Sequence, residues 1–161
     1  YSASSSAWAA AETLAVGVPF NREIAVAAGG AGQAVVAWLG RDGSGNDAVF
    51  ARVLAGGSWA APMQASTANA QRPQAVQVAM NAGGRIVLHW AEGGVRQAWA
   101  RVFDGGNWRA AQAVQTALDP MQTQRTPLPL RTLSLAPDGS ALLTWRESGV
   151  NGSTLMGAFL Q

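Results

Sequence analysis

The sequence predicts an all-β protein built from three repeats of about 50 residues, and three observations support this prediction. Val, Trp, Gly, Gln and Thr are plentiful, whereas lysine is absent and few glutamates are present, a balance that favours short strands over helices. Trp38, Trp90 and Trp145 each end a short apolar run, and they are separated by 52 and 55 residues. A glycine lies six residues before each of these tryptophans, at Gly32, Gly84 and Gly139.

Each repeat contains four apolar segments in the same order. The first three segments of the repeats are expected as strands at 23–28, 34–38 and 48–54, at 75–80, 85–90 and 97–103, and at 131–135, 140–145 and 154–160. A fourth strand is expected after a Gly-Gly turn, around Trp59 and Trp108, and a related strand around Trp8 at 7–15. Turn sequences rich in Gly, Asn and Asp join the segments, so each repeat is predicted to be a four-stranded antiparallel meander.

The second strand of each repeat is apolar on both faces, because runs such as 34–39 and 86–90 do not alternate with polar residues. An antiparallel strand with one face in water should alternate, so the sheets are expected to stack face to face. Four-stranded meanders of this length that stack radially are the blades of a β-propeller. A two-sheet sandwich is the alternative, but a sandwich does not require an internal period.

The order of the strands predicts how the propeller closes. Residues 1–6 are predicted to be a linker, and residues 7–161 one three-blade segment with repeats at about 7–54, 55–103 and 104–161. The segment begins with a fourth strand and stops after a third strand. Three blades are too few for a ring, since propellers have about four to eight. The chain is therefore predicted to be half of a six-bladed β-propeller, closed by a second copy as a C2 homodimer or by the remainder of a longer chain.

The second repeat carries a resemblance to a known family. Its distinctive positions are Pro73, Val76, Val78, Gly84, Trp90, the ARVFD run at 100–104, Gly105, Gly106 and Trp108. This pattern is similar to the tandem repeats of exported bacterial six-bladed β-propeller proteins. The resemblance covers 7–161, although the third repeat departs from it with MGAF at 156–159. It implies a bacterial protein that is secreted, periplasmic or at the cell surface, and it implies a binding or scaffold role.

Composition excludes several function classes. The chain has 161 residues, which fits one domain, and it has no cysteine, which excludes disulfides and thiolate metal sites. Its eleven basic residues are all arginines, the net charge is +2, and no basic stripe typical of nucleic-acid binding is visible. No apolar run approaches the length of a membrane span. The first residues have neither the basic nor the apolar region of a signal peptide.

Tryptophan, arginine and glutamate recur at matching positions and form the candidate ligand-binding set. Tryptophan rings can stack on sugar faces, and arginine and glutamate can bind hydroxyl groups, so a pocket between blades could hold a glycan. The same tryptophans could instead fill the space between blades as core residues. The candidate residues are Trp38, Trp90, Trp145, Glu92, Glu147, Arg52 and Arg101.

No catalytic, metal or cofactor site is predicted. His89 is the only histidine, and strand alternation places it on the face opposite Trp90. Tyr1 is the only tyrosine and lies at the terminus, which removes the nucleophile that sialidases of six-bladed form need. The oxygen-rich segment 41–47 resembles part of a calcium loop but lacks the glutamate at the twelfth position, so a polar hairpin is expected there.

The sequence therefore predicts a non-enzymatic binding or scaffold module outside the cytoplasm, presenting propeller loops to a protein or a glycan. Two alternatives stay open. The first is a carbohydrate-binding lectin with repeated Trp/Arg/Glu pockets between blades. The second is a glycoside hydrolase, which would need a pair of carboxylates at a fixed separation in a cleft.

Overall fold

A computed structural model describes residues 10–18, 23–67, 70, 72–93, 97–115, 132–149 and 152–161, with the side chains of 115, 146–149 and 152–154 outside the description. In these ranges the chain is all-β and forms three antiparallel sheets. The predicted linker at 1–6 and Trp8 lie outside the described residues. The all-β prediction is thus confirmed for the described part of the chain.

The first sheet follows the chain in order and has a broken outer strand. Its strands are β1 (Ile24–Ala28), β2 (Ala34–Arg41), β3 (Asp47–Ala55), β4 (Ser58–Trp59) and β5 (Met63–Gln64). Because β2 occupies one edge of β3, both β4 and β5 pair with its other edge. Pro62 lies between them and has no N–H to donate, which fits an interrupted edge strand. β4 and β5 therefore share the fourth position of the sheet.

The second sheet repeats this arrangement. Its strands are β6 (Pro73–Met80), β7 (Ile86–Glu92), β8 (Gln97–Asp104), β9 (Asn107–Trp108) and β10 (Gln112–Gln115), with β9 and β10 both paired to β8. The third sheet has three strands among the described residues, β11 (Thr132–Leu135), β12 (Ala141–Gly149) and β13 (Gly152–Leu160). The first and second sheets thus each contain strands from two of the repeat units delimited above, since those units begin with the outer strand, whereas the described strands of the third sheet all come from the last unit.

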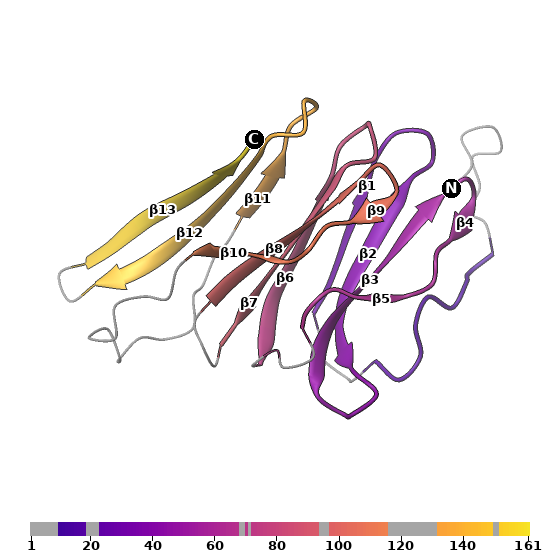
Figure 1. Cartoon of the computed structure of the whole chain (residues 1–161), viewed down its shortest axis with the longest axis horizontal. Coiled ribbons are helices and arrows are strands. Elements are labelled where there is room, and N and C mark those ends of the chain that lie inside the picture. The colour runs from indigo at the N-terminus through magenta and orange to yellow at the C-terminus, as the bar shows by residue number, and fades with distance from the viewer. Residues whose placement is uncertain are drawn as a thin grey trace.

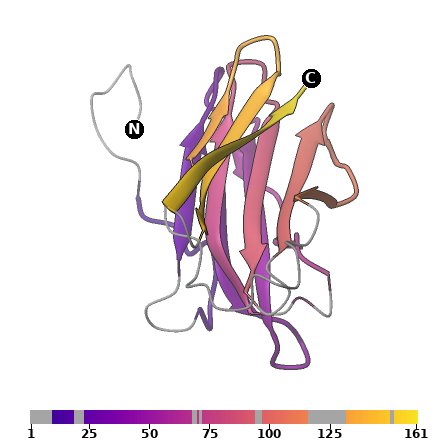
Figure 2. The same ribbon diagram turned by 90° about the vertical axis from the view of Figure 1, so that its left-hand side faces the viewer.

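The three sheets lie side by side in chain order (Figure 1), and Figure 2 views this stack from the side of the third sheet. The closest approaches between sheets join β6 to β1 and β2 on one side and to β11 on the other. The sheets therefore meet most closely through their first strands. All seven residues of β7 are buried, because the second sheet is covered on both faces. This explains the absence of alternation in that segment of the sequence.

Two apolar clusters fill the space between the first and second sheets. In the larger one, Leu39, Val49 and Ala51 of the first sheet pack against Leu88 and Trp90 of the second. In the smaller one, Val35 and Val53 pack with Ile86. Alternation along β2 and β7 sends these residues to the facing sides of their sheets. Burial of this size is the main stabilising contribution to the stack.

The turns that follow the first strands also bring neighbouring sheets together. Gln33 of the first sheet lies over Gly84 of the second, where an added Cβ would come within 2.6 Å of its Oε1. Arg85 of the second sheet lies over Gly139 of the third in the same way, within 2.6 Å of its Nη1. Both glycines have positive φ, of 82° and 91°, so the turn and the close approach each favour glycine.

Most strand predictions hold, and one does not. The expected first, second and third strands of every repeat are confirmed within a few residues. The expected N-terminal strand at 7–15 is wrong for its described part, since 10–15 has no strand conformation. A strand needs a neighbour with which to form a hydrogen-bonded ladder, and β3 next to this segment already pairs with β4 and β5.

Candidate functional site

The three repeated tryptophans occupy the same register position in their sheets. Trp38 stands opposite Phe50. Trp90 stands opposite Trp99, and Trp145 opposite Met156. The Trp38 and Phe50 rings stack with centroids 5.8 Å apart. All three tryptophans are buried, so in this arrangement their faces pack against protein. Their predicted role as sugar-stacking residues stays a prediction.

Of the predicted acidic ligand residues, the structure brings one to its tryptophan. Trp90 Nε1 donates a hydrogen bond to Glu92 Oε1 at 3.4 Å, and Glu92 is itself buried. The backbone of Glu147 pairs with Thr154 on β13, and its side chain lies outside the described residues. The predicted Trp–Glu pair is therefore formed in the second sheet, in a buried position.

Arg101 connects the second sheet to the first through backbone carbonyls. Its Nε donates to Arg109 O at 2.6 Å within its own sheet. Its Nη1 donates to Ala65 O at 3.1 Å and to Gln64 O at 3.3 Å, at the outer edge of the first sheet. We call an arginine that joins two neighbouring segments in this way an arginine tether. A guanidinium is suited to it because its donors diverge from one rigid plane.

Arg52 forms a second arginine tether with the same geometry. Its Nε donates to Ala60 O at 2.7 Å within the first sheet. Its Nη1 donates to Leu14 O at 2.7 Å and to Thr13 O at 3.5 Å. Thr13 and Leu14 follow Trp8 by five and six residues, as Gln64 and Ala65 follow Trp59. The segment around Leu14 therefore lies beside the first sheet in the same way that the outer edge of the first sheet lies beside the second.

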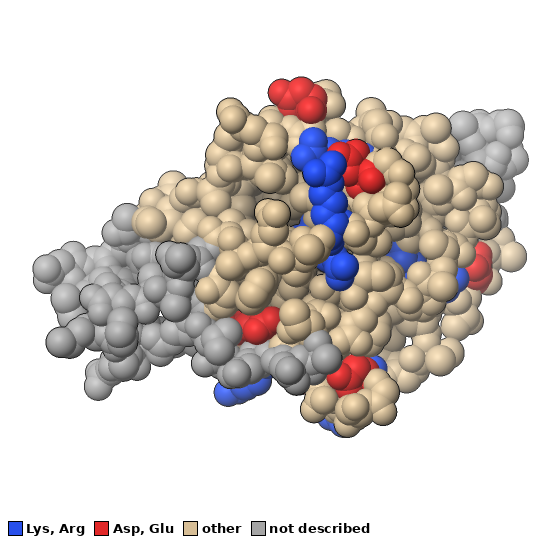
Figure 3. Space-filling view, viewed as in Figure 1, with Lys and Arg blue, Asp and Glu red and all other residues tan. Residues whose placement is uncertain are grey.

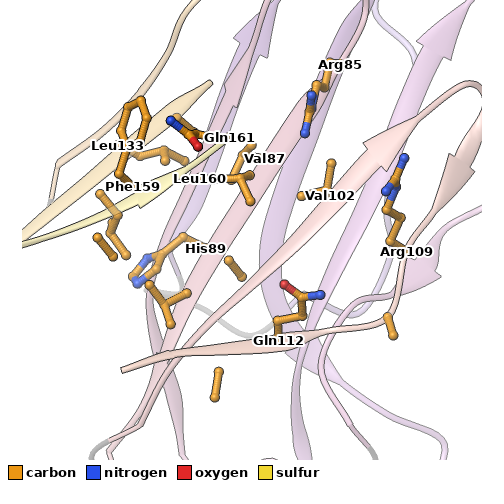
Figure 4. Close-up of a pocket in the computed structure, with 17 residues that line it drawn as sticks. Arg85, Val87, His89, Val102, Arg109, Gln112, Leu133, Phe159, Leu160 and Gln161 are labelled. Atoms are coloured by element: carbon orange, nitrogen blue, oxygen red, sulfur yellow. The ribbon is translucent and has the colours of Figure 1, made fainter. Parts of the chain in front are cut away.

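The third sheet has no arginine tether at this position. Ala158 stands opposite Leu143, as Arg101 stands opposite Leu88 and Arg52 opposite Val36. A cavity of about 320 Å³ lies between the second and third sheets, and Ala158 lines it. Its apolar walls come from β7, β8 and β11, at Val87, Val102 and Leu133 (Figure 4), and from β12 at Leu143. Replacement of a long side chain by a methyl group accounts for this space.

The polar side chains of the cavity are mostly hydrogen-bond donors. Arg85, His89, Arg109 and Gln112 line it from the second sheet and its outer edge, and Gln161 lines it from beside the third sheet (Figure 4). His89 is fully buried, on the face of β7 opposite Trp90, as alternation predicts. Among the described residues that line the cavity, none has a carboxylate, hydroxyl or thiol side chain. The lining therefore offers groups that bind, with no nucleophile beside the histidine.

Two carboxylates lie near the arginines of the cavity without lining it. Arg109 Nη2 lies 3.0 Å from Asp104 Oδ2, in a pair that is largely exposed. The backbone N–H of Ser140, helped by the Ser140 hydroxyl and more weakly by the charge of Arg85, lowers the pKa of Asp138 below its ordinary value. Charged side chains are few on the face seen in Figure 3, where a short column of basic side chains has acidic groups beside its upper end and other basic atoms show toward the right and the lower edge.

The segment at 41–47 is the hairpin turn between β2 and β3, as expected. Asp42 Oδ1 accepts the backbone N–H groups of Ser44 and Asn46, both at 2.9 Å. These bonds lower the pKa of Asp42, chiefly the bond from Asn46. Within the described ranges no group of three or more histidine, aspartate or glutamate side chains could hold a metal ion. The carboxylate thus closes the turn.

Sequence reasoning missed the cavity and its arginines. Arg85 and Arg109 recur at no matching position of the other repeats, so nothing in the pattern singled them out. The available signal was the departure of the third repeat at 156–159, where Ala158 replaces the arginine of the ARV motif. That this replacement leaves a space between two sheets can be inferred only when the carbonyls that the other two arginines contact are known.

In the described part of the chain no helix is long and apolar enough to span a membrane. The geometry of the sheets, the two arginine tethers and the cavity are the features from which function has to be inferred. No protein-family model matches the chain, and no curated protein matches it either.

Proposed function

We propose that the chain is three consecutive blades of a six-bladed β-propeller and serves as a non-enzymatic binding or scaffold module. Each sheet would be one blade, with its first strand nearest the axis of the ring. The closest approach of the sheets through β1, β6 and β11 supports this arrangement, because blades spread from the axis outward. A location outside the cytoplasm rests on the resemblance of the second repeat alone.

The observation that carries the proposal is the repeated arginine tether. Arg101 holds the outer edge of the preceding sheet at Gln64 and Ala65. Arg52 holds Thr13 and Leu14 with the same atoms. The segment that contains Leu14 therefore occupies the outer position of a sheet that would precede the first one. In a ring, that preceding sheet is the last blade of the neighbouring half.

The two end sheets leave faces that a neighbouring blade would cover. Val49 and Ala98 are fully buried, whereas Leu155, at the equivalent position of the third sheet, is 77% exposed. On the opposite end, Ile24 and Val26 of β1 are 65% and 72% exposed. Exposed apolar surface of this kind is typical of an interface. We propose that the third sheet of one half packs on the first sheet of the other, and that 10–14 lies beside the outer edge of β13.

A binding role fits the chemistry better than catalysis does. The cavity lining described above has arginines, a histidine and two glutamines beside apolar walls. Such a site can hold a ligand by charge and apolar contact, but it lacks the paired carboxylates of a glycoside hydrolase. Chromogenic glycosides should therefore not be hydrolysed.

The test is the mass of the 161-residue chain in solution by light scattering. We expect a value near twice the chain mass of 16.6 kDa. Arg52→Met should lower the dimer fraction at least tenfold, because it releases the segment at Thr13 and Leu14. The matched control is Arg41→Met, which removes an exposed arginine that pairs with Asp47 at 4.0 Å.

A folded chain that stays monomeric at all concentrations would contradict closure by a second copy. If the ring is closed by the remainder of a longer chain instead, the missing repeats of that chain can be produced separately. Their addition to the 161-residue chain should then give a ring of the same size. A chain that neither dimerises nor accepts such repeats, while it unfolds cooperatively, would contradict the propeller arrangement itself. Phe159→Asp, on the exposed face of β13, should abolish assembly while the circular dichroism of the sheets is retained.

A further inference from the structure

The cavity between the second and third sheets exists because one arginine tether is missing. In the space between the first and second sheets, the side chain of Arg101 reaches across to the carbonyls of Gln64 and Ala65. The equivalent carbonyls in the second sheet belong to Ala113 and Val114, five and six residues after Trp108, and both residues line the cavity. Ala158 stands where the arginine would begin and cannot reach them.

The size and walls of the cavity suit a small molecule with an apolar body. Its volume of about 320 Å³ lies at the lower end of the range for small-molecule pockets. Val87 and Val102 line it from the second sheet and Leu133 from the third (Figure 4), together with Leu143 of the third sheet. Contact of an aliphatic chain with these side chains would remove apolar surface of both from water.

The charges of the lining determine the sign of the ligand. Arg85 and Arg109 both line the cavity, and no described lining residue is acidic. In the described part of the chain, Arg85 Nε is buried and has no hydrogen-bond acceptor. Its guanidinium is held against Gly139, which leaves no Cβ in the way. A buried guanidinium N–H without an acceptor favours an anionic acceptor, and a carboxylate matches its geometry.

A cationic ligand is the alternative that the carbonyls of Ala113 and Val114 would suggest, because a guanidinium occupies the equivalent place between the first two sheets. Such a ligand would lie between the positive charges of Arg85 and Arg109. Like charges at this range repel, and a site of low polarity strengthens the repulsion. The lining therefore favours an anion.

We propose that this cavity binds a small carboxylic acid with an apolar body, with the carboxylate at Arg85 and the apolar body against Val102, Leu133 and Leu143. The proposal deepens the binding role inferred above and rests on it for the stacking of the second and third sheets. Octanoate is the probe, since it has one carboxylate and one unbranched apolar chain. Octylamine and octanol have the same chain with a cationic and a neutral head group.

Titration calorimetry with the 161-residue chain should show saturable binding of octanoate and at least tenfold weaker binding of octylamine and octanol. Arg85→Gln should weaken octanoate binding at least tenfold. Arg41→Gln, the matched loss of an exposed arginine far from the cavity lining, should change it less than twofold. Because Arg85 also packs on Gly139, a second variant is needed that does not depend on it.

Ala158→Arg is that second variant. It places in the third sheet the side chain that fills the equivalent space in the other two, so it should abolish octanoate binding while the fold is retained. Equal binding of octanoate and octylamine, no binding of octanoate at millimolar concentration, or unchanged binding by the Ala158→Arg variant would each overturn the proposal. The mass of the same samples separates the two proposals, since a dimer that binds no octanoate contradicts only this one.

Discussion

Single glycines determine how closely the turns of neighbouring sheets approach one another. At Gly29 an added Cβ would lie 2.6 Å from the backbone O of Asn81 in the second sheet. At Gly43, in the turn between β2 and β3, an added Cβ would meet nothing within 4 Å. Neither glycine has a positive φ, so the two positions differ in contact and not in backbone strain. Gly29 is therefore required by packing between sheets.

Gly29→Ala should destabilise the protein by about 1–3 kcal/mol, because backbone atoms must move apart to admit the methyl group. Gly43→Ala is the control and should change the free energy of unfolding by no more than about 0.5 kcal/mol. Urea denaturation followed by tryptophan fluorescence measures both. Equal effects of the two substitutions would show that the turns of the first two sheets do not approach as described.

At the scale of elements, the arginine tether at Arg101 joins the second sheet to the outer edge of the first, away from the closest contacts between sheets at β1, β6 and β11. Arg101 begins on β8 and ends at carbonyls beside β5. Since it bonds to carbonyls and not to a carboxylate, its strength does not depend on a second charge. Hydrogen bonds from a charged donor are among the stronger ones in proteins.

Arg101→Met should lower the free energy of unfolding by about 2–3 kcal/mol, since it leaves carbonyl acceptors of two sheets without their charged donor. Arg101→Lys should recover less than half of this loss, because an ammonium cannot serve diverging acceptors as a guanidinium does. Arg41→Met serves as the control for loss of a positive charge. Full recovery by lysine would mean that charge alone, and not the fork of donors, holds the sheets.

The strands were predictable from sequence because their signals are local. Trp90 and the glycine six residues before it locate a strand and its turn, and equivalent positions in the other repeats confirm the register. The break in each outer strand was not predictable in the same way. In both sheets an arginine, Arg52 or Arg101, bonds to the carbonyl of Ala60 or Arg109 at the break, and these are contacts between segments that the repeat pattern does not show.

At the scale of the whole molecule, the candidate site follows from a difference between sheets and not from the pattern that the repeats share. The predicted set of tryptophans, glutamates and arginines is largely buried or bonded to backbone. The cavity lies instead beside Ala158, which stands where the first two sheets have an arginine. Sequence shows the substitution, but only the stacked sheets show that it opens a space beside Arg85.

The series of sheets should also unfold in a defined order. Each sheet contacts mainly its neighbour, as in repeat proteins, and the third sheet lacks an arginine tether. Amide hydrogen exchange should therefore be faster in β11 and β12 than in β7, which is buried along its whole length. Uniform protection of all three sheets would contradict this order.

The exposed faces of the two end sheets are not copies of one another, and this governs how the chain can polymerise. Leu155 and Phe159 belong to one face and Ile24 and Val26 to the other, so association joins head to tail. A head-to-tail contact closes only if the rotation per chain divides a full circle. With half a turn per chain, as in the propeller proposed above, two copies end the process. A substitution that changes this rotation would prevent the ring from closing. Each addition of a chain would then leave one apolar face exposed at either end, and the same contact would build an open filament that grows with concentration.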